Sequence, residues 1–382
     1  MRKQVVFCAG HLLSPSVASG GDVLFCELAA RIARSRPEWD VVALAPDFAR
    51  ADLERFFGRV VTFATGPGEG SQGSPAKVMS TWLRRLPFAP RELSALKPDL
   101  VHSTGDFFID VWPVVFARRR AQMKWSGVVH HVNAPPHRRK NEPAVAAVSY
   151  ALQRASFVAL RSADAISLLN TGVRSDLERL RFDPARLHVV GAGIDIERFP
   201  LIPAAERTRR VVWVNRLEPT KGIEDLPEIV RAFPDDVVVD VVGRGPDVHV
   251  ARLRQGLVQA GVDSRCIVHG FLSEQELREV IRRAAVFISC SYEEGWGISI
   301  AEALAMGLPC VAYDLPSHGE IFGDEIRRVR VGDKAAFADT VNQVLARGDT
   351  DEERAARRRI AARHSLDACA RREEEVFAAL LS

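Results

Sequence analysis

The chain has 382 residues, enough for about two domains of ordinary size. Its hydrophobic fraction of 47% and charged fraction of 26% are typical of a globular protein, and no apolar run approaches the roughly 20 residues of a membrane-spanning helix. The six cysteines show no CxxC spacing, which disfavours a structural zinc site and indicates a reduced, cytoplasmic protein.

Charge is distributed unevenly along the chain. Residues 1–190 contain 26 Lys and Arg against 17 Asp and Glu, whereas residues 191–382 contain 26 against 32. This asymmetry predicts different partners for the two halves.

Strand-like and helix-like patterns alternate through the first half. The apolar runs predicted as buried strands are residues 4–9, 41–45, 60–64, 100–103, 127–133, 165–169 and 187–190. Such alternation predicts a parallel α/β sheet with right-handed crossovers.

Two features of these strands are candidate ligand contacts. Gly20 and Gly21 lie between the first strand and a helix, where they form either a phosphate cradle or a simple turn. His130 and His131 end the fifth run, and one of them is expected to face the ligand crevice because neighbours on a strand point opposite ways. A merely hydrogen-bonded histidine is the alternative for each.

Three basic clusters also lie in this half: Arg84-Arg85, Arg118–Arg120 with Lys124, and Arg138–Lys140. Charge runs are usually solvated faces; the alternatives are an anionic acceptor or peripheral contact with the inner face of an anionic membrane. Beside the first cluster, a membrane-lying helix or a core face would equally explain Trp82, Leu83, Leu86 and Phe88.

The glycines at 191 and 193 follow a strand and indicate a domain boundary. A second α/β series follows, with predicted strands at residues 211–215, 237–242, 266–269, 286–290 and 310–313, and a closing helix at about 365–381. His269 and Gly270 stand at a strand end, where backbone groups could read a nucleobase. The stretch 243–246 lacks the third glycine of a dinucleotide fingerprint, so an oxidoreductase fits poorly.

Two cations stand at the first strand end of this series. Arg216 ends the strand and Lys221 opens the following helix, so together they could neutralise a diphosphate without a metal ion. Exposed surface cations are the alternative.

The most informative stretch is residues 294–302, EGWGISIAE, between a predicted strand and a run of helix formers. Gly295, Trp296 and Gly297 make a tight turn through which a ligand can approach the backbone. The amides of Ile298 and Ser299 then open a helix, whose start attracts phosphate.

A carboxylate stands on either side of this turn. Glu294 precedes it and Glu302 lies about one helical turn beyond it, and carboxylates suit hydroxyl groups better than phosphate. Together with the helix start they predict a nucleotide-sugar site, although an isolated Glu pair is usually just solvated.

The segment SYEEGWG at 291–297, continued by GLPCVA at 307–312, closely resembles the signature of the GT-B glycosyltransferases of family four. The pattern from Arg216 to Lys221-Gly222 resembles the diphosphate-binding pair of that family. The resemblance is close over about residues 210–322. It implies an α/β fold of two Rossmann-like parallel-sheet domains facing a central cleft. The acceptor domain would be residues 1–190, the nucleotide-sugar domain 191–364, and 365–382 a helix returning to the first domain.

The resemblance also implies roles for the candidate residues. Glu294 would hold the sugar hydroxyls and Glu302 the ribose, while Gly20 and Gly21 would face the donor diphosphate. One of the two histidines, His130 or His131, would hold the donor sugar.

The implied reaction moves a hexose-type sugar from a nucleotide-diphosphate sugar to an acceptor hydroxyl with retention of configuration. Uridine is the expected base by family frequency. Catalysis is expected to be electrostatic, with Arg216, Lys221 and the helix start stabilising the departing diphosphate, and no cofactor, metal ion or nucleic-acid partner is expected. The alternatives are a non-catalytic nucleotide-sugar-binding protein, or an epimerase or phosphorylase on the same scaffold.

Overall fold

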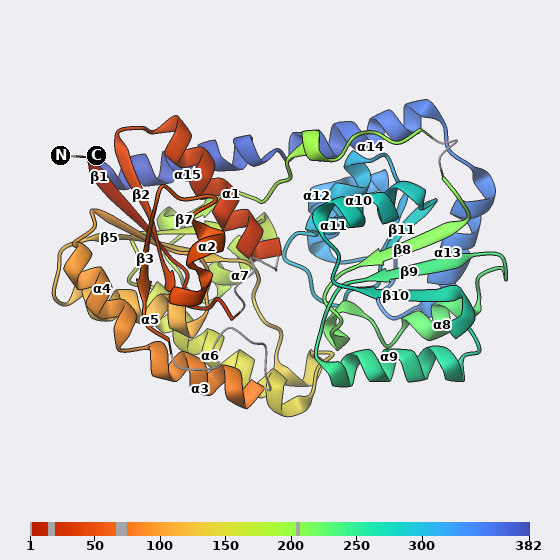
Figure 1. The fold of residues 1–382 in the computed structure, drawn as a ribbon, viewed down its shortest axis with the longest axis horizontal. Coiled ribbons are helices and arrows are strands. Elements are labelled where there is room, and N and C mark those ends of the chain that lie inside the picture. Colours follow the sequence, from red (N-terminus) through yellow and green to blue (C-terminus); the bar gives the residue numbers. More distant parts are fainter. Residues whose placement is uncertain (1, 14–19, 66–74, 204–206) are drawn as a thin grey trace. The chain divides into compact units, whose positions relative to one another are not determined.

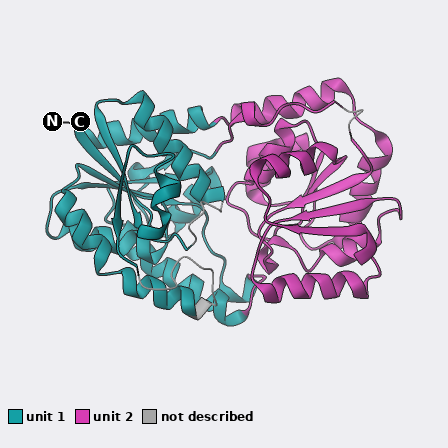
Figure 2. Ribbon diagram, in the orientation of Figure 1, with its two compact units in different colours: residues 1–138, 143–192, 366–382 teal, residues 139–142, 193–365 magenta. Residues whose placement is uncertain are grey.

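The computed structural model describes residues 2–13, 20–65, 75–203 and 207–382, which form two compact α/β units (Figure 1). Unit 1 comprises residues 1–138, 143–192 and 366–382, and unit 2 comprises 139–142 and 193–365 (Figure 2). The short segment 139–142 therefore belongs to unit 2, although the sequence analysis assigned it to the first domain.

Unit 1 is built on a parallel sheet of seven strands in the order β3-β2-β1-β4-β5-β6-β7. The strands are β1 (Lys3–Cys8), β2 (Trp39–Pro46), β3 (Arg59–Phe63), β4 (Leu100–Ser103), β5 (Lys124–Val129), β6 (Ala165–Leu168) and β7 (Leu187–Val189). The predicted run 127–133 was placed too late in the chain, because β5 starts at Lys124 and ends at Val129. His130 and His131 therefore follow the strand and do not end it.

The helices of unit 1 are α1 (Gly20–Ser35), α2 (Arg50–Leu53), α3 (Pro75–Arg85), α4 (Phe88–Leu96), α5 (Phe108–Arg118), α6 (Pro143–Leu160), α7 (Thr171–Arg179) and α15 (Leu366–Leu381). Apolar side chains from both faces of the central strands are fully buried, as the neighbouring pairs Val5 and Val6 on β1 and Leu100 and Val101 on β4 show. The burial of strands on both faces explains why they read as continuous apolar runs.

Unit 2 has a parallel sheet of six strands in the order β10-β9-β8-β11-β12-β13. They are β8 (Arg210–Val214), β9 (Val238–Val242), β10 (Cys266–Gly270), β11 (Val286–Ser289), β12 (Cys310–Tyr313) and β13 (Ile326–Val329). Strand β13 was not predicted, because two of its four residues are exposed arginines at the sheet edge.

The helices of unit 2 are α8 (Leu226–Arg231), α9 (Asp247–Gln259), α10 (Glu274–Arg283), α11 (Ile298–Ala305), α12 (Pro316–Phe322), α13 (Lys334–Arg347) and α14 (Asp351–Arg363). None of the helices in the described ranges has the length and low charge needed to cross a membrane.

Each sheet has one point where the strand order reverses. In unit 1 this point lies between β1 and β4, and in unit 2 between β8 and β11. In open parallel sheets, ligands bind beyond the carboxyl ends of the strands at such a point. The residues that directly follow β1, β4, β8 and β11 are therefore the candidates for ligand binding.

The C-terminal helix α15 packs against the sheet of unit 1 and against α1 (Figure 1). Its Glu373 is 2% exposed, accepts a hydrogen bond from Ser167 Oγ at 2.8 Å, and lies 3.6 Å from His102 Nδ1. Burial raises the pKa of Glu373 to about 7, although the Ser167 hydrogen bond opposes this, and burial lowers the pKa of His102 to about 3. The helix is thus held by a buried pair that is neutral below pH 7.

We predict that Glu373→Gln changes the pH dependence of stability. Unfolded Glu373 loses its proton near pH 4.3, whereas the folded protein keeps it to about pH 7, so this carboxyl's stabilising contribution is present below pH 4 and is lost as pH rises through 7. The neutral glutamine does not titrate. Relative to the unmodified protein, the variant should therefore gain on the order of 3 kcal/mol in unfolding free energy between pH 4.5 and 8. Denaturant titrations at several pH values measure this, and a difference that stays constant with pH would contradict it.

Candidate functional site

The carboxyl ends of β8 and β11 bring a lysine and a glutamate together in unit 2. The Lys221 ammonium lies 2.8 Å from Glu294 Oε1 and donates to the carbonyl oxygen of Glu293 at 2.8 Å. Asn215 and Ser291 donate to the same Oε1 atom, at 3.0 and 2.9 Å. Two residues predicted from separate motifs therefore share one polar cluster.

A glycine lets the loop after β8 approach the end of β11. Lys221 closes a 3₁₀ turn, Pro219–Lys221, and Gly222 follows with a φ of 75°. A Cβ atom on Gly222 would lie 2.0 Å from the carbonyl oxygen of Cys290, so a larger residue would force the two segments apart. This approach buries the Lys221 side chain against the turn that carries Glu294.

The charge of Glu294 is set by its partners. Burial alone would raise its pKa, but the Lys221 charge and the hydrogen bonds from Lys221 and Asn215 lower the pKa to about 2. Glu294 is therefore a carboxylate at neutral pH. The three donors all reach Oε1, and within the described ranges no donor reaches Oε2, so that oxygen can accept from a ligand hydroxyl.

Arg216 lies at the same strand end, but its guanidinium is turned to another partner. It donates to Glu218 Oε1 at 2.9 Å, and its side chain is 57% exposed. Exposed pairs of this kind contribute little to stability, so the guanidinium can change partner at small cost when an anion binds. The structure thus brings Lys221 to Glu294 and leaves Arg216 outside their cluster.

The helix start that was predicted to attract phosphate follows a left-handed glycine. Gly297 has a φ of 101°, and its carbonyl accepts the amides of Ile300 and Ala301, the first bonds of α11. The amides of Ile298 and Ser299 precede these bonds and belong to the set that a helix leaves to external acceptors.

In the turn before this helix, the tryptophan side chain is buried in the core and the backbone remains the part that could contact a ligand. Trp296 is 3% exposed, and its ring packs edge-on against Phe322 and His364, with centroids 5.6 and 5.2 Å away. Its side chain belongs to the core of unit 2, so only its backbone could contact a donor. Gly295 is half-buried in the turn. Ser317, at the start of α12, donates a hydrogen bond to the carbonyl oxygen of Glu294 at 3.0 Å.

Glu302 differs from Glu294 in its protonation. It is half-buried on α11, one turn beyond the helix start. Burial raises its pKa to about 8, and the negative charge of Glu274 adds to the effect. At neutral pH Glu302 is largely a neutral carboxyl, and it would ionise just above that range.

His269 and Gly270 end β10, as predicted, but both are already engaged. His269 Nε2 lies 2.7 Å from Asp240 Oδ1, and the Gly270 carbonyl accepts the amide of Gly243 at 2.8 Å. The groups that were expected to read a base therefore also hold the strand end in place.

An exposed aromatic ring lies immediately beyond them. Phe271 is 58% exposed, and the Arg244 guanidinium lies 5.1 Å from its ring centroid. A flat base could stack on such a pair. Neither side chain was predicted to belong to the site.

The segment 139–142 supplies a further cation to unit 2. Arg139 forms a bidentate pair with Glu293, at 2.8 Å from Nε to Oε1 and 2.7 Å from Nη2 to Oε2, and the Lys140 ammonium lies 5.0 Å from the Tyr292 ring centroid. Their basic cluster was interpreted as a solvated face or a contact for an acceptor or membrane. The solvated-face interpretation was wrong for Arg139, which pairs with Glu293, whereas Lys140 is exposed as that interpretation expected.

In unit 1 the loop after β1 carries a half-buried histidine. His11 Nδ1 lies 2.8 Å from Asp110 Oδ2, and its Nε2 lies 2.9 Å from Asp22 Oδ1. Burial alone would lower the pKa of His11, but the two carboxylates raise it to about 10, so the ring is an imidazolium. Asp22 directly follows Gly20 and Gly21, the first residues of α1, and so ties the predicted glycine pair to this cluster.

Arg85 holds the same loop from α3. It is 1% exposed and donates to the carbonyls of Gly10 and Leu12 at 2.9 and 2.6 Å. Trp82 Nε1 donates to the His11 carbonyl at 3.3 Å. The prediction of a solvated or membrane-facing charge is therefore wrong for Arg85, which is a structural cation.

The histidine pair follows β5 at the carboxyl end of the same sheet. Burial lowers the pKa of His130 to about 4, and the charges of His131 and His11 add to this, so His130 is neutral. The His131 carbonyl accepts from Gln153 Nε2 at 2.8 Å. Both histidines are half-buried, and their role toward a donor sugar stays a prediction. Among the residues described, no group of three or more His, Cys, Asp and Glu is arranged to hold a metal ion.

Two family models match the chain in succession. Residues 18–198 match the one described as Glycosyltransferase Family 4, and residues 195–364 match the one described as Glycosyl transferases group 1.

Curated proteins and solved structures are also similar to this chain. The GDP-mannose:cellobiosyl-diphosphopolyprenol alpha-mannosyltransferase of Xanthomonas oryzae pv. oryzae is 27% identical over 277 residues, covering 70% of each chain. Other curated relatives are matched over about half of their length. Sucrose-phosphate synthase from Thermosynechococcus elongatus superimposes with a TM-score of 0.80 at 18% identity, covering 99% of both chains. Anabaena HepE in complex with UDP-glucose gives 0.77 at 16%, covering 98% of this chain and 99% of that one.

We predict that Lys221→Met destabilises unit 2 by about 3–5 kcal/mol, because it leaves the Glu294 carboxylate buried without its cation. Adding Glu294→Gln should recover a substantial part of this loss, since no uncompensated charge remains. Urea unfolding of both single variants and the double variant gives the coupling free energy. A coupling near zero would show that the two side chains do not stabilise each other.

Proposed function

Since this chain belongs to the GT-B glycosyltransferases of family four, we propose that it transfers a hexose from a nucleotide-diphosphate sugar to an acceptor hydroxyl. The observation that carries the proposal is the Lys221–Glu294 pair beside the start of α11. The ammonium of Lys221, the carboxylate of Glu294 and the first amides of α11 thus all lie beyond the carboxyl ends of β8 and β11.

Each group has a distinct task in the proposed reaction. The diphosphate would accept hydrogen bonds from the amides of Ile298 and Ser299, and its charge would be balanced by Lys221 and by Arg216 released from Glu218. As the sugar–phosphate bond breaks, negative charge grows on the leaving oxygen, and these fixed donors stabilise it.

The sugar would be held by the carboxylate whose second oxygen has no donor in the described ranges. Glu294 Oε2 can accept from sugar hydroxyls while Oε1 stays bonded to Lys221, so orientation and charge are set together. We propose that transfer retains the anomeric configuration and that one of the two histidines, His130 or His131, contacts the sugar. Retention and the histidine role are supported by the resemblance to family four.

We further propose a UDP-sugar as donor and no requirement for a metal ion. The HepE structure of similar fold is described in complex with UDP-glucose, whereas the Xanthomonas relative is named for GDP-mannose. These two names differ in the base of the nucleotide. We expect the preference for one base to be set where Phe271 and Arg244 form an exposed stacking surface on unit 2. Two organic cations and a helix start can balance a diphosphate without a metal.

One assay separates this proposal from its alternatives. The protein is incubated with each common nucleotide sugar, in EDTA and in magnesium, alone and with an acceptor panel, and products are separated by chromatography. Release of UDP with a glycosylated acceptor supports transfer. Bound donor without any released UDP across the panel would indicate a non-catalytic binding protein, and a new sugar nucleotide would indicate an epimerase.

We predict that Glu294→Gln lowers kcat/KM for transfer by on the order of 10²-fold or more, because the amide cannot bind both the ammonium and the sugar hydroxyls as the carboxylate does. The matched control is Glu224→Gln, at an exposed glutamate in the loop between β8 and α8, which should keep full activity. Thermal melting checks that both variants fold. Full activity in Glu294→Gln would refute the assignment of the donor site.

The pKa of Glu302 predicts a pH effect on donor binding. The carboxylate accepts two ribose hydroxyls better than the neutral acid, so affinity for UDP-glucose should rise severalfold between pH 7 and 9 as Glu302 ionises near pH 8. The diphosphate of the donor carries constant charge over this range. Calorimetric titrations should show this rise in the unmodified protein and a flat profile in Glu302→Gln. Equal pH profiles for the two proteins would exclude Glu302 as the titrating group.

A further inference from the structure

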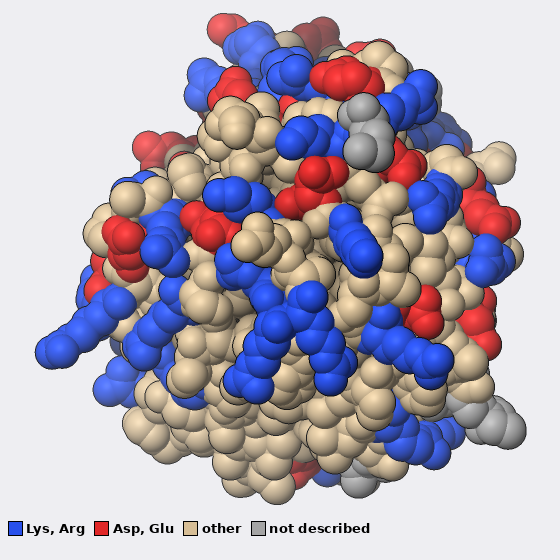
Figure 3. All heavy atoms as spheres, turned by 90° about the vertical axis from the view of Figure 1, so that its left-hand side faces the viewer, with Lys and Arg blue, Asp and Glu red and all other residues tan. Residues whose placement is uncertain are grey.

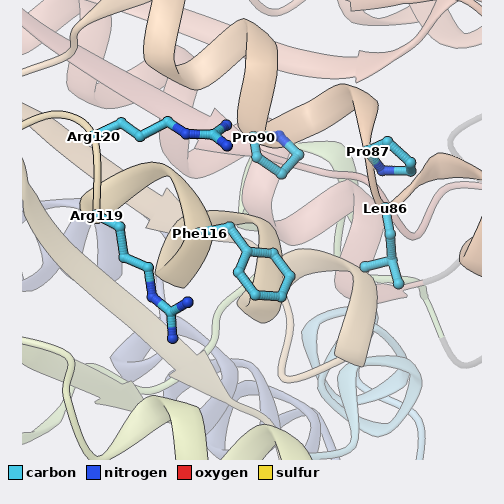
Figure 4. A pocket seen from close by; sticks show the side chains of 6 residues that line it. All are labelled: Leu86, Pro87, Pro90, Phe116, Arg119 and Arg120. Carbon is cyan, nitrogen blue, oxygen red and sulfur yellow. The ribbon is translucent and has the colours of Figure 1, made fainter.

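A hollow with no part in the candidate site lies on the outer surface of unit 1. It has a volume of about 470 Å³ and is lined by Leu86, Pro87, Pro90, Phe116, Arg119 and Arg120. Figure 4 shows Arg120 extending toward Pro90, and Arg119 on the same side as the Phe116 ring. One wall is thus apolar and the other carries two guanidinium groups.

The hollow lies away from the strand ends that carry His11. Helix α5 leaves the carboxyl end of β4 and returns to Lys124, where β5 begins. In a parallel sheet this return places the C-terminal end of α5, with Arg119 and Arg120, near the amino ends of the strands. A ligand held here would not touch the residues proposed to act on the sugar.

Several other arginines of unit 1 pair with a carboxylate. Arg118 pairs with Asp164, and Arg174 and Arg179 pair with carboxylates on their own helix. Arg119 and Arg120 are exposed, and within the described ranges neither lies within 4 Å of a carboxylate; Arg119 contacts the Phe116 ring at 5.8 Å. Their positive charge is therefore not neutralised by the protein.

The same surface is basic over a wider area. Arg91, Lys97 and Lys124 are also exposed on α4, just after it, and at the start of β5. In Figure 3, which faces this side of unit 1, the lower half shows many Lys and Arg side chains over neutral surface and few carboxylates. This field favours an anionic partner.

Large apolar side chains are exposed on α3, α4 and α5, the helices that line or adjoin the hollow, and Phe116 itself lines it. Leu83 on α3 is 51% exposed, Phe88 on α4 42%, and Phe116 on α5 36%. Apolar side chains next to unpaired arginines suit the boundary between lipid headgroups and acyl chains, where the rings enter the apolar layer and the guanidinium groups meet phosphate. A soluble anion would make no use of the apolar side chains.

We propose that this surface, formed by Leu83, Phe88, Phe116, Arg119 and Arg120, docks the protein on an anionic phospholipid bilayer, with the hollow accepting a headgroup phosphate. Charge complementarity and the exposed apolar residues select the bilayer over other anionic partners. The proposal is independent of the transfer reaction and of the residues that perform it.

Vesicle co-sedimentation of the full chain tests this docking surface. The unmodified protein should bind vesicles of 30% phosphatidylglycerol in phosphatidylcholine at least tenfold more tightly than vesicles of phosphatidylcholine alone, and added salt should weaken binding. Arg119→Gln with Arg120→Gln should lower the partition coefficient about tenfold, and Phe88→Ser with Phe116→Ser should also lower it. The control, Arg174→Gln with Arg179→Gln, removes two arginines that are already paired and should bind like the unmodified protein.

Thermal melting and UDP binding show whether each variant is folded. Equal binding to both vesicle types by the unmodified protein, or undiminished binding by the Arg119 and Arg120 variant, would overturn the proposal. Saturable binding of inorganic phosphate or of duplex DNA that needs these arginines, without vesicle binding, would overturn it in favour of a soluble anion or a nucleic acid.

Discussion

The ion pair between Lys221 and Glu294 is the constraint on which the candidate site depends. Removing two charges from water is costly, and a buried pair is stable only when its remaining hydrogen-bonding groups are also satisfied. Here Asn215, Ser291 and the Glu293 carbonyl supply those bonds. The pair therefore fixes a carboxylate at neutral pH in a position where it would otherwise take up a proton.

That pair requires a particular backbone path on both strands that carry it. Gly222 permits the loop after β8 to lie against Cys290 at the end of β11, and Gly297 permits α11 to begin directly after the turn. Behind the turn, Trp296 anchors it in the core and Arg139 holds Glu293. The turn that carries Glu293 and Glu294 is thus held by the close approach at Gly222, by the buried Trp296 ring and by the Arg139–Glu293 pair.

The two units place charge clusters at equivalent topological positions. Beyond β1 and β4, His11 is an imidazolium between Asp22 and Asp110, whereas beyond β8 and β11 a lysine pairs with a glutamate. In each cluster, opposite charges lie within 2.9 Å of one another, and this attraction favours the charged forms of His11 and Glu294 over the effect of burial. Rigid charges of this kind need little reorganisation when charge develops during a reaction.

Much of this arrangement could be predicted from local sequence. Alternating apolar runs predicted the parallel sheets, and the stretch 294–302 predicted a glycine turn and a helix start after the strand at 286–290, because each depends on neighbouring residues. The remaining site contacts join distant positions: Asp110 binds His11 across 99 residues, and Arg139 binds Glu293 across 154. No local pattern distinguishes these partners from ordinary surface charges.

Arginine was the least predictable residue type for the same reason. Arg85 and Arg120 both lie in basic runs, yet Arg85 is 1% exposed and bonded to carbonyls while Arg120 is open to solvent. Strand β13 was not predicted because its two exposed arginines interrupt the apolar run by which the other strands were recognised. Tertiary packing decides these cases, and packing is not visible in the composition of a run.

The most direct test of the central claim is a crystal structure of the protein grown with UDP in the presence of EDTA. The account predicts that the diphosphate lies within hydrogen-bonding distance of Lys221 and the Ile298 amide, with Arg216 turned from Glu218 toward it. A diphosphate bound elsewhere, or bound only when a metal ion is restored, would contradict it.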